Sequence, residues 1–249
     1  MGGVTARRTV IGTDPVPSFE HLVVVSAHPD DETFGLGGLV SAFVAAGTRV
    51  SLVCLTCGEG STLGASCDLA DRRTRELHCA AQVLGISQVT IHHHPDGALD
   101  TVNLGHLVAD VLAVAGDADG LLTFDHGGIT GHPDHQRATD AAVAAARRLG
   151  IPVLAWAIPQ RVAELLRHEY GAPFVGRPAN EIDHVVAVDR SGQYAAMACH
   201  GSQLADNPVP RRRIHLQGDR EYLRQLPERR PESRPTEPTA ATRRTPRTS

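Results

Sequence analysis

Six short apolar segments alternate with segments of helical spacing, and this alternation restricts the chain to the α/β class of folds. The strand-like segments are residues 21–26, 49–55, 88–92, 120–124, 152–157 and 183–188, and the helical segments are residues 35–46, 68–84, 102–115, 133–149, 159–169 and 190–202. Leu22–Val25 and Val50–Leu55 are apolar almost throughout, which indicates strands buried on both faces. The sequence therefore predicts a Rossmann-like, doubly wound α/β fold, with a mostly parallel sheet and helices on both faces.

The chain divides into three parts. We expect an N-terminal extension over residues 1–19, one folded domain over residues 20–228, and a disordered tail rich in Arg, Pro and Thr over residues 229–249. Residues 211–249 hold 11 of the 24 basic residues but only 5 of the 28 acidic ones, so a basic end follows an acidic body. The tail has almost no apolar residues to offset the entropy lost on ordering.

Composition also narrows the partners and the compartment. Every basic residue is arginine, a bias more typical of a high-GC genome than of nucleic-acid binding, so no nucleic-acid partner is expected. No apolar stretch is long enough for a signal peptide or a membrane span, which predicts a cytoplasmic protein. Five cysteines, an odd number, favour a reduced compartment over a disulfide scaffold. The sequence does not decide between a monomer and a homo-oligomer.

Polar clusters follow each of the first four predicted strands, at residues 28–32, 56–61, 92–96 and 125–135. In open α/β sheets, ligands bind beyond the carboxyl ends of the strands. We therefore expect four loops to open on one rim of the sheet. Two of these loops combine imidazole and carboxylate groups, Ala-His-Pro-Asp-Asp-Glu at residues 27–32 and Gly-His-Pro-Asp-His at residues 131–135, and together they suggest one metal site.

The first of these loops offers two metal ligands and a separate carboxylate. His28 and Asp31 lie three residues apart where a strand turns toward a helix, so both side chains can face the same side. Asp30 must then point elsewhere, where it can act as a general base toward a water held at the metal. The alternative interpretation is that these carboxylates cap a helix that begins near Thr33.

The second loop can complete the ligand set. Pro133 suits the first position of a helix, which makes His132 the N-cap and His135 the third helical residue. His135 then gives three protein ligands in all and leaves a position open for water, as in catalytic zinc sites. His132, held protonated by Asp134 or Asp125, could stabilise an oxyanion or protonate a leaving nitrogen. The alternative for His132 is an ordinary surface histidine at a helix cap.

The two motifs, AHPDDE and GHPDH, resemble those of the PIG-L/LmbE-like family of zinc-dependent N-acetylglucosaminyl de-N-acetylases. The similarity extends over about residues 20–205, and the short motifs at residues 56–60, 73–77, 96–97 and 200–203 agree with it. The resemblance implies zinc, or iron(II) in cells, as the cofactor. It implies these site residues: His28, Asp31 and His135 as metal ligands, Asp30 as general base, His132 as acid or oxyanion partner, and Arg73 and Asp96 as substrate-binding residues.

The resemblance also implies the reaction, which is removal of an acetyl group from an N-acetylglucosamine-type sugar conjugate, a small-molecule partner. Family members that act in mycothiol synthesis have a mobile tyrosine two residues before the first histidine of the second motif, and here that position is Thr130, which is too short to replace it. Two alternatives are a mycothiol S-conjugate amidase and a deacetylase of an antibiotic intermediate. A third, of another class, is a sugar-binding module that holds a metal but has no turnover, and Asp30 argues against it.

Other motifs were interpreted as structural. Gly35–Gly38 resembles the start of a dinucleotide-binding motif, but Val40 stands where the third glycine is needed. His92–His94 are three consecutive histidines, which cannot easily converge on one ion, so we interpret them as residues at a strand end, one of which could line the pocket. Cys54 and Cys57 have CxxC spacing without a second pair, which favours packing thiols over a zinc or redox motif.

Overall fold

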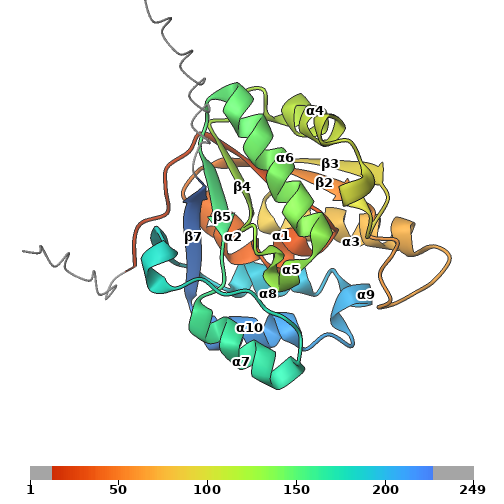
Figure 1. Cartoon of the computed structure of the whole chain (residues 1–249), viewed down its shortest axis with the longest axis vertical. Coiled ribbons are helices and arrows are strands. Elements are labelled where there is room, and N and C mark those ends of the chain that lie inside the picture. The colour runs from red at the N-terminus through yellow and green to blue at the C-terminus, as the bar shows by residue number, and fades with distance from the viewer. Residues whose placement is uncertain (1–12, 227–249) are drawn as a thin grey trace, which may run out of the picture.

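A seven-stranded sheet forms the centre of the computed structural model, which describes residues 13–226 (Figure 1). The strands are β1 (His21–Ser26), β2 (Arg49–Thr56), β3 (Gln88–His94), β4 (Gly120–Phe124), β5 (Val153–Trp156), β6 (His184–Ala187) and β7 (Arg220–Leu226). Their order across the sheet is β3-β2-β1-β4-β5-β7-β6, and only β7 runs antiparallel to its neighbours. The prediction of a mostly parallel α/β sheet is confirmed.

Helices cover both faces of the sheet. The longer helices are α2 (Gly37–Ala45), α3 (Leu69–Leu84), α4 (Leu104–Ala115), α6 (Pro133–Leu149), α7 (Gln160–Tyr170), α8 (Ser191–Met197) and α10 (Val209–Gln217), and the short turns are α1 (Asp31–Phe34), α5 (Gly128–Gly131), α9 (Gly201–Leu204), η1 (Leu99–Thr101) and η2 (Ala179–Glu181). Figure 1 shows α4 and α6 on one face, with α2, α3 and α8 on the other. No helix in this part of the chain is both long and apolar enough to cross a membrane.

The core is split by the sheet into two layers, which explains the unbroken apolar pattern of the first strand. Leu22 and Val24 belong to the apolar cluster that includes residues of α2, α3 and α7. Val23 and Val25 belong to the cluster that includes residues of α4 and α6. All four side chains are almost completely buried. Successive residues of a strand point to opposite faces, so a strand covered on both sides reads as a nearly continuous apolar run.

The last strand was not anticipated from the sequence. Residues Arg220–Leu226 mix charged, polar and apolar side chains without a continuous apolar run, and the strand they form inserts between β5 and β6. Part of the predicted N-terminal extension also contacts this region, because Asp14 exchanges hydrogen bonds with the backbone of Val185. The predicted tail, residues 229–249, and the domain boundary at residue 228 lie outside the described residues.

The cysteines differ from the expectation of reduced thiols. Cys79 in α3 and Cys199, which follows α8, form a disulfide, whereas Cys54, Cys57 and Cys67 are free. The disulfide joins residues 120 positions apart. It therefore fastens α3 to the segment that leads into α9. The number of cysteines in the sequence could not predict this contact between distant parts of the chain.

We expect Cys79→Ser to lower the free energy of unfolding by about 2–4 kcal/mol, because the disulfide closes a long loop and restricts the unfolded chain. Urea unfolding of oxidised protein measures the change. Cys67→Ser is the control, since this thiol is exposed and free. Equal stability of the two variants, or two free thiols at Cys79 and Cys199 by mass spectrometry, would contradict the prediction.

Candidate active site

The carboxyl ends of the first strands open on a common cavity of about 500 Å³. All seven site residues named from the sequence line it: His28, Asp30, Asp31, Arg73, Asp96, His132 and His135. Further polar lining comes from Ser61, Thr130, Gln203, Asn207 and Arg213, and apolar lining from Phe34, Phe124, Ile129, Trp156, Ala172, Phe174 and Val209. The four loops therefore meet on one rim, as the strand order requires.

Three donor atoms lie close together at the base of this cavity. His135 Nε2 is 3.1 Å from Asp31 Oδ1 and 3.2 Å from His28 Nδ1. His28 Nδ1 is 3.7 Å from Asp31 Oδ2, which also accepts hydrogen bonds from the backbone N–H groups of Ala27 and His28. These separations are close to those of ligands that share one tetrahedral ion, about 3.3 Å at the bond lengths of zinc.

The hydrogen bonds of the two histidine rings fix which nitrogen is free. His135 Nδ1 donates to the carbonyl oxygen of Gly128 at 3.0 Å, so Nε2 keeps its lone pair. His28 Nε2 lies 3.1 Å from carboxylate oxygens of both Asp134 and Asp96, which leaves Nδ1 as the free nitrogen. These two nitrogens lie 3.2 Å apart, and both can donate a lone pair to one cation between them. The donor set therefore fits a divalent metal ion.

Asp134, which the sequence interpretation placed beside His132 as its carboxylate partner, contacts His28 instead. Its side chain is completely buried and accepts hydrogen bonds from the backbone N–H groups of Gly97 and Leu99, as well as from His28. Burial alone lowers the pKa of His28, but Asp134 and Asp96 outweigh it and raise the pKa to about 10. A carboxylate that accepts from the outer nitrogen of a ligating histidine orients the ring and increases its basicity.

Asp31 is ionised in this setting. Burial raises the pKa of its carboxyl group, but His135 and His28 have the larger combined effect, and the pKa lies well below its usual range. Metal ligation requires the charged form of a carboxylate. Asp31 is therefore ready to bind a cation without first losing a proton.

Asp30 differs from Asp31 in both backbone and electrostatics. Its φ of 129° is a conformation that side chains other than glycine rarely adopt, and such strain concentrates at functional sites. Burial raises the pKa of Asp30 to about 6, against the opposing effect of Arg73. A carboxylate with a pKa near neutrality is suited to exchange protons during a reaction.

A buried ion pair between Glu32 and His200 holds the strained backbone of Asp30. Glu32 Oε2 accepts a hydrogen bond from the Asp30 N–H at 3.0 Å, and Glu32 Oε1 lies 2.7 Å from His200 Nε2. Burial lowers the pKa of His200, but Glu32, with Asp30 and Glu76, raises it overall, which favours the charged pair. His200 comes from the motif at residues 200–203, whose contact with Glu32 could not be predicted from the sequence.

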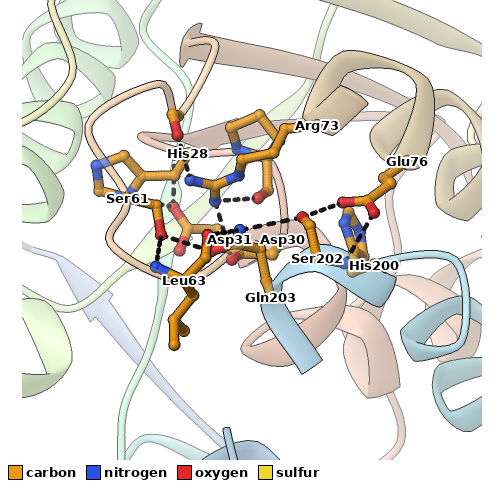
Figure 2. A network of polar contacts seen from close by, with 12 residues as sticks. His28, Asp30, Asp31, Ser61, Leu63, Arg73, Glu76, His200, Ser202 and Gln203 are labelled. Atoms are coloured by element: carbon orange, nitrogen blue, oxygen red, sulfur yellow. Dashed lines mark hydrogen bonds and ion pairs between the residues drawn. The ribbon is translucent and has the colours of Figure 1, made fainter. Parts of the chain in front are cut away.

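A second contact fixes the same motif. Ser202 donates to Glu76 of α3 through both its backbone N–H, at 2.9 Å, and its hydroxyl, at 2.6 Å. Figure 2 shows this pair beside His200. The neighbouring Gln203 accepts a hydrogen bond from Ser61 at the cavity edge. The loops after β1 and β2 are thus joined to α9 by polar contacts.

We expect Glu32→Gln to lower the free energy of unfolding by about 1.5–3 kcal/mol, the range for a hydrogen bond to a charged group. It should also lower kcat more than it raises KM, because Glu32 positions Asp30 and does not line the cavity. Urea unfolding and steady-state kinetics measure the two effects. Glu20→Gln, at an exposed position, is the control. Unchanged stability and kcat would exclude a positioning role for Glu32.

His132 is the N-cap of α6, and Pro133 is its first helical residue, so this part of the sequence interpretation is confirmed. His132 Nδ1 accepts a hydrogen bond from the backbone N–H of Asp134 at 3.2 Å. The neutral ring therefore carries its proton on Nε2, where it can be donated.

The expectation that nearby carboxylates keep His132 protonated is not met. Burial lowers the pKa of His132, and His135 and His28 lower it further. The two carboxylates named from the sequence are occupied elsewhere, Asp134 by His28 and Asp125 by Arg177 and Arg224. His132 is thus suited to act as a neutral hydrogen-bond donor. Thr130, in place of the tyrosine of some relatives, lines the cavity beside it.

Arg73 lines the cavity and is held by hydrogen bonds to the loops around it. Its side chain is 4% exposed, and its two terminal nitrogens donate to the carbonyl oxygens of Gly58 and Pro29 and to Asp30. Gly58 has a φ of 68° and packs against the guanidinium so closely that a Cβ atom would clash with it. Arg73 therefore positions Asp30 and the loops around it.

Asp96 is likewise tied into the site. It accepts from the Gly60 N–H at 2.8 Å and contacts His28 at 3.1 Å. Burial raises the pKa of Asp96, but the hydrogen bond from His28 and its charge lower it overall. Its carboxylate lines the cavity, so contact with a substrate is compatible with these bonds.

The sheet and the histidine-carboxylate cluster together define an α/β protein with a candidate divalent-metal site at the carboxyl ends of its strands. Residues 23–146 match the PIG-L family, GlcNAc-PI de-N-acetylase. The 1D-myo-inositol 2-acetamido-2-deoxy-alpha-D-glucopyranoside deacetylase of Mycobacterium sp. (strain JLS) is 31% identical over 254 residues, with 82% of each chain covered. The chain belongs to the PIG-L family.

Solved structures show how widely the fold is used. The N,N'-diacetylchitobiose deacetylase of Pyrococcus horikoshii superposes with a TM-score of 0.62 at 19% identity and covers 86% of each chain. The 4-carboxy-2-hydroxymuconate hydratase of Pseudomonas putida KT2440 superposes with a TM-score of 0.61 at 19% identity, covering 86% of this chain and 99% of its own. A deacetylase and a hydratase share the fold, so the activity must be argued from the site.

Proposed function

We propose that this protein is a metal-dependent hydrolase that removes the acetyl group from the 2-amino group of a glucosamine-type sugar conjugate. The observation that carries the proposal is the position of Asp30, a carboxylate with a raised pKa in the same cavity as the three donor atoms of His28, Asp31 and His135. The membership of the PIG-L family and the deacetylase names of its relatives support the same reaction.

Six residues of the cavity have a part in this reaction. When bound by His28, Asp31 and His135, zinc, or iron(II) in cells, supplies Lewis acidity toward the amide carbonyl and increases the acidity of water. Asp30 accepts a proton from the attacking water and, as the tetrahedral intermediate collapses, returns it to the leaving nitrogen. His132 donates from Nε2 to the developing oxyanion. Arg73 holds the carboxylate of Asp30 in place by a hydrogen bond to its Oδ2.

The cavity lining suits an acylated sugar. Ser61, Gln203 and Asn207 offer hydroxyl and amide groups that match sugar hydroxyls. Phe34, Phe124 and Phe174 offer an apolar surface that matches the acyl group or an apolar aglycone. The identity of the conjugate is open to a mycothiol precursor, a mycothiol S-conjugate or an antibiotic intermediate, and we place the enzyme in the cytoplasm.

A sugar-binding module without turnover explains the site less well. Such a module needs the metal ligands but has no use for Asp30, whose carboxyl has a raised pKa and whose backbone is strained. It also has no need for Arg73 and Glu32, which hold Asp30 from two sides. A catalytic role accounts for all three residues.

Release of acetate from a panel of N-acetylglucosamine conjugates tests the proposal. The panel should include an inositol conjugate, N,N'-diacetylchitobiose, a thioether-bearing conjugate and longer N-acyl chains. We expect turnover that is abolished by a chelator and restored by zinc or iron(II). Binding of the sugars without release of acetate or another acyl group would instead favour the binding module.

We expect His132→Ala to lower kcat by about 10²–10³-fold, the effect of losing one oxyanion donor. The metal should stay bound, because the three proposed ligands are His28, Asp31 and His135, and His132 is not one of them. Kinetics and elemental analysis of the same sample measure both properties. If the variant loses its metal, His132 is a ligand and the assignment of His132 and His135 must be exchanged.

A further inference from the structure

The three consecutive histidines at the end of β3 do not point the same way. His92 and His94 lie two residues apart on a strand, so their rings are on the same face and stack with centroids 5.8 Å apart. His93 is on the other face, where its Nδ1 contacts the Cys57 thiol. The objection that three adjacent side chains cannot share one ion therefore does not apply to His92 and His94.

Asp110 of α4 supplies a third donor to this pair. Its Oδ2 is 2.6 Å from His94 Nε2, and its Oδ1 is 3.6 Å from His92 Nδ1. One ligand atom from each of the three residues lies within 4.8 Å of the others. Ligands of a tetrahedral zinc ion are about 3.3 Å apart, so adjustment of the three side chains within this spacing would bring them into reach of one ion.

The exposure of the cluster also suits an ion. The three side chains are 22–25% exposed, so water can reach the cluster and complete the coordination. Burial lowers the pKa of His92, and His94 and His93 add to the effect against that of Asp110. A neutral imidazole has a lone pair to donate, and two imidazoles with one carboxylate favour zinc and similar divalent ions over magnesium or calcium.

We propose that His92, His94 and Asp110 form a second binding site for a divalent cation of the zinc type, separate from the active site. None of the three residues lines the cavity. β3 is the edge strand of the sheet, and Figure 1 shows α4 beside it. An ion there fastens α4 to the edge strand, which leads through Pro95 into the loop that carries Asp96. Its role is to stabilise this edge, with no part in the reaction.

Zinc titration of the metal-free, full-length protein against a chromophoric chelator tests the second site. We expect two equivalents for the wild type and one for the double variant H92Q/H94Q, which should still deacetylate its substrate. The matched control is His93→Gln, on the opposite face of the same strand, and it should keep two equivalents. A wild type with one equivalent, or a double variant with two, would overturn the proposal.

A second measurement guards against misfolding of the double variant. In a His135→Ala background, where the active-site donor set is incomplete, cobalt(II) should give the absorption of a tetrahedral site. Asp110→Asn, which keeps the size of the side chain, should remove that absorption, and His93→Gln should not. Zinc should also raise the Tm of His135→Ala but not of the same chain with Asp110→Asn. If the cobalt absorption and the Tm shift are the same with and without Asp110→Asn, the site is refuted.

Discussion

Asp30→Asn should lower kcat by about 10²–10⁴-fold while the metal content stays unchanged, because only the group that accepts the proton is lost. The amide of asparagine still fits beside Arg73, but it cannot take a proton from water. The three donor atoms of the metal site belong to other residues, and so the ion should remain. Acetate release and elemental analysis of the same sample measure the two properties.

The control for this variant is Asp100→Asn, because Asp100 is exposed and does not line the cavity. It should have the kcat of the wild type. A near-normal kcat for Asp30→Asn would show that another group accepts the proton. Loss of metal from Asp30→Asn would instead place Asp30 among the ligands, which its 3.0 Å contact with Arg73 argues against.

His28→Ala should abolish both metal binding at the cavity and acetate release. The substitution removes one of three donors and leaves the buried Asp134 carboxylate without its histidine partner. Even loss of an outer-shell partner lowers metal affinity by about 10–100-fold, and loss of a ligand should exceed this. The measurement is zinc content in a chain that also carries His94→Gln, so that only the cavity site is counted.

His126→Ala is the control for His28→Ala. His126 lies on the loop after β4, is exposed, and contacts only Asp140 among the polar partners of the described residues. It should keep both the zinc of the cavity and the activity. One equivalent of zinc retained by His28→Ala in the His94→Gln background would show that the ion is held by other groups, such as His132 and Asp134.

The sequence could predict the first six strands of the sheet and the meeting of the two histidine motifs, because both depend on local patterns. A buried parallel strand is apolar at nearly every position, and the rim at the strand ends follows from the fold class. The N-cap at His132 could likewise be predicted, since Pro133 marks the first turn of the helix.

The partners of the site residues could not be predicted in this way. The contact between Glu32 and His200 joins positions 168 residues apart, and no local pattern encodes it. In the sequence, Asp134 is an acidic residue in the first turn of a predicted helix, a position that is usually exposed. Its complete burial and its contact with His28 could not be predicted from that position. The contacts of Arg73 with backbone oxygens and with Asp30 also join positions distant in the sequence, and no local pattern encodes them.

The place of β7 has a consequence for how the chain folds. Residues Arg220–Leu226 are synthesised after the other six strands that the structure describes within residues 13–226, but they lie second from the edge of the sheet, between β5 and β6. Until they emerge from the ribosome, β5 is an open edge, and its four residues are all apolar and buried in the finished protein. Open apolar edges invite pairing with other chains. The sheet of the nascent protein is therefore completed late, and β5 is exposed to wrong pairing until then. Chaperones that shield β5 should increase the yield of folded enzyme.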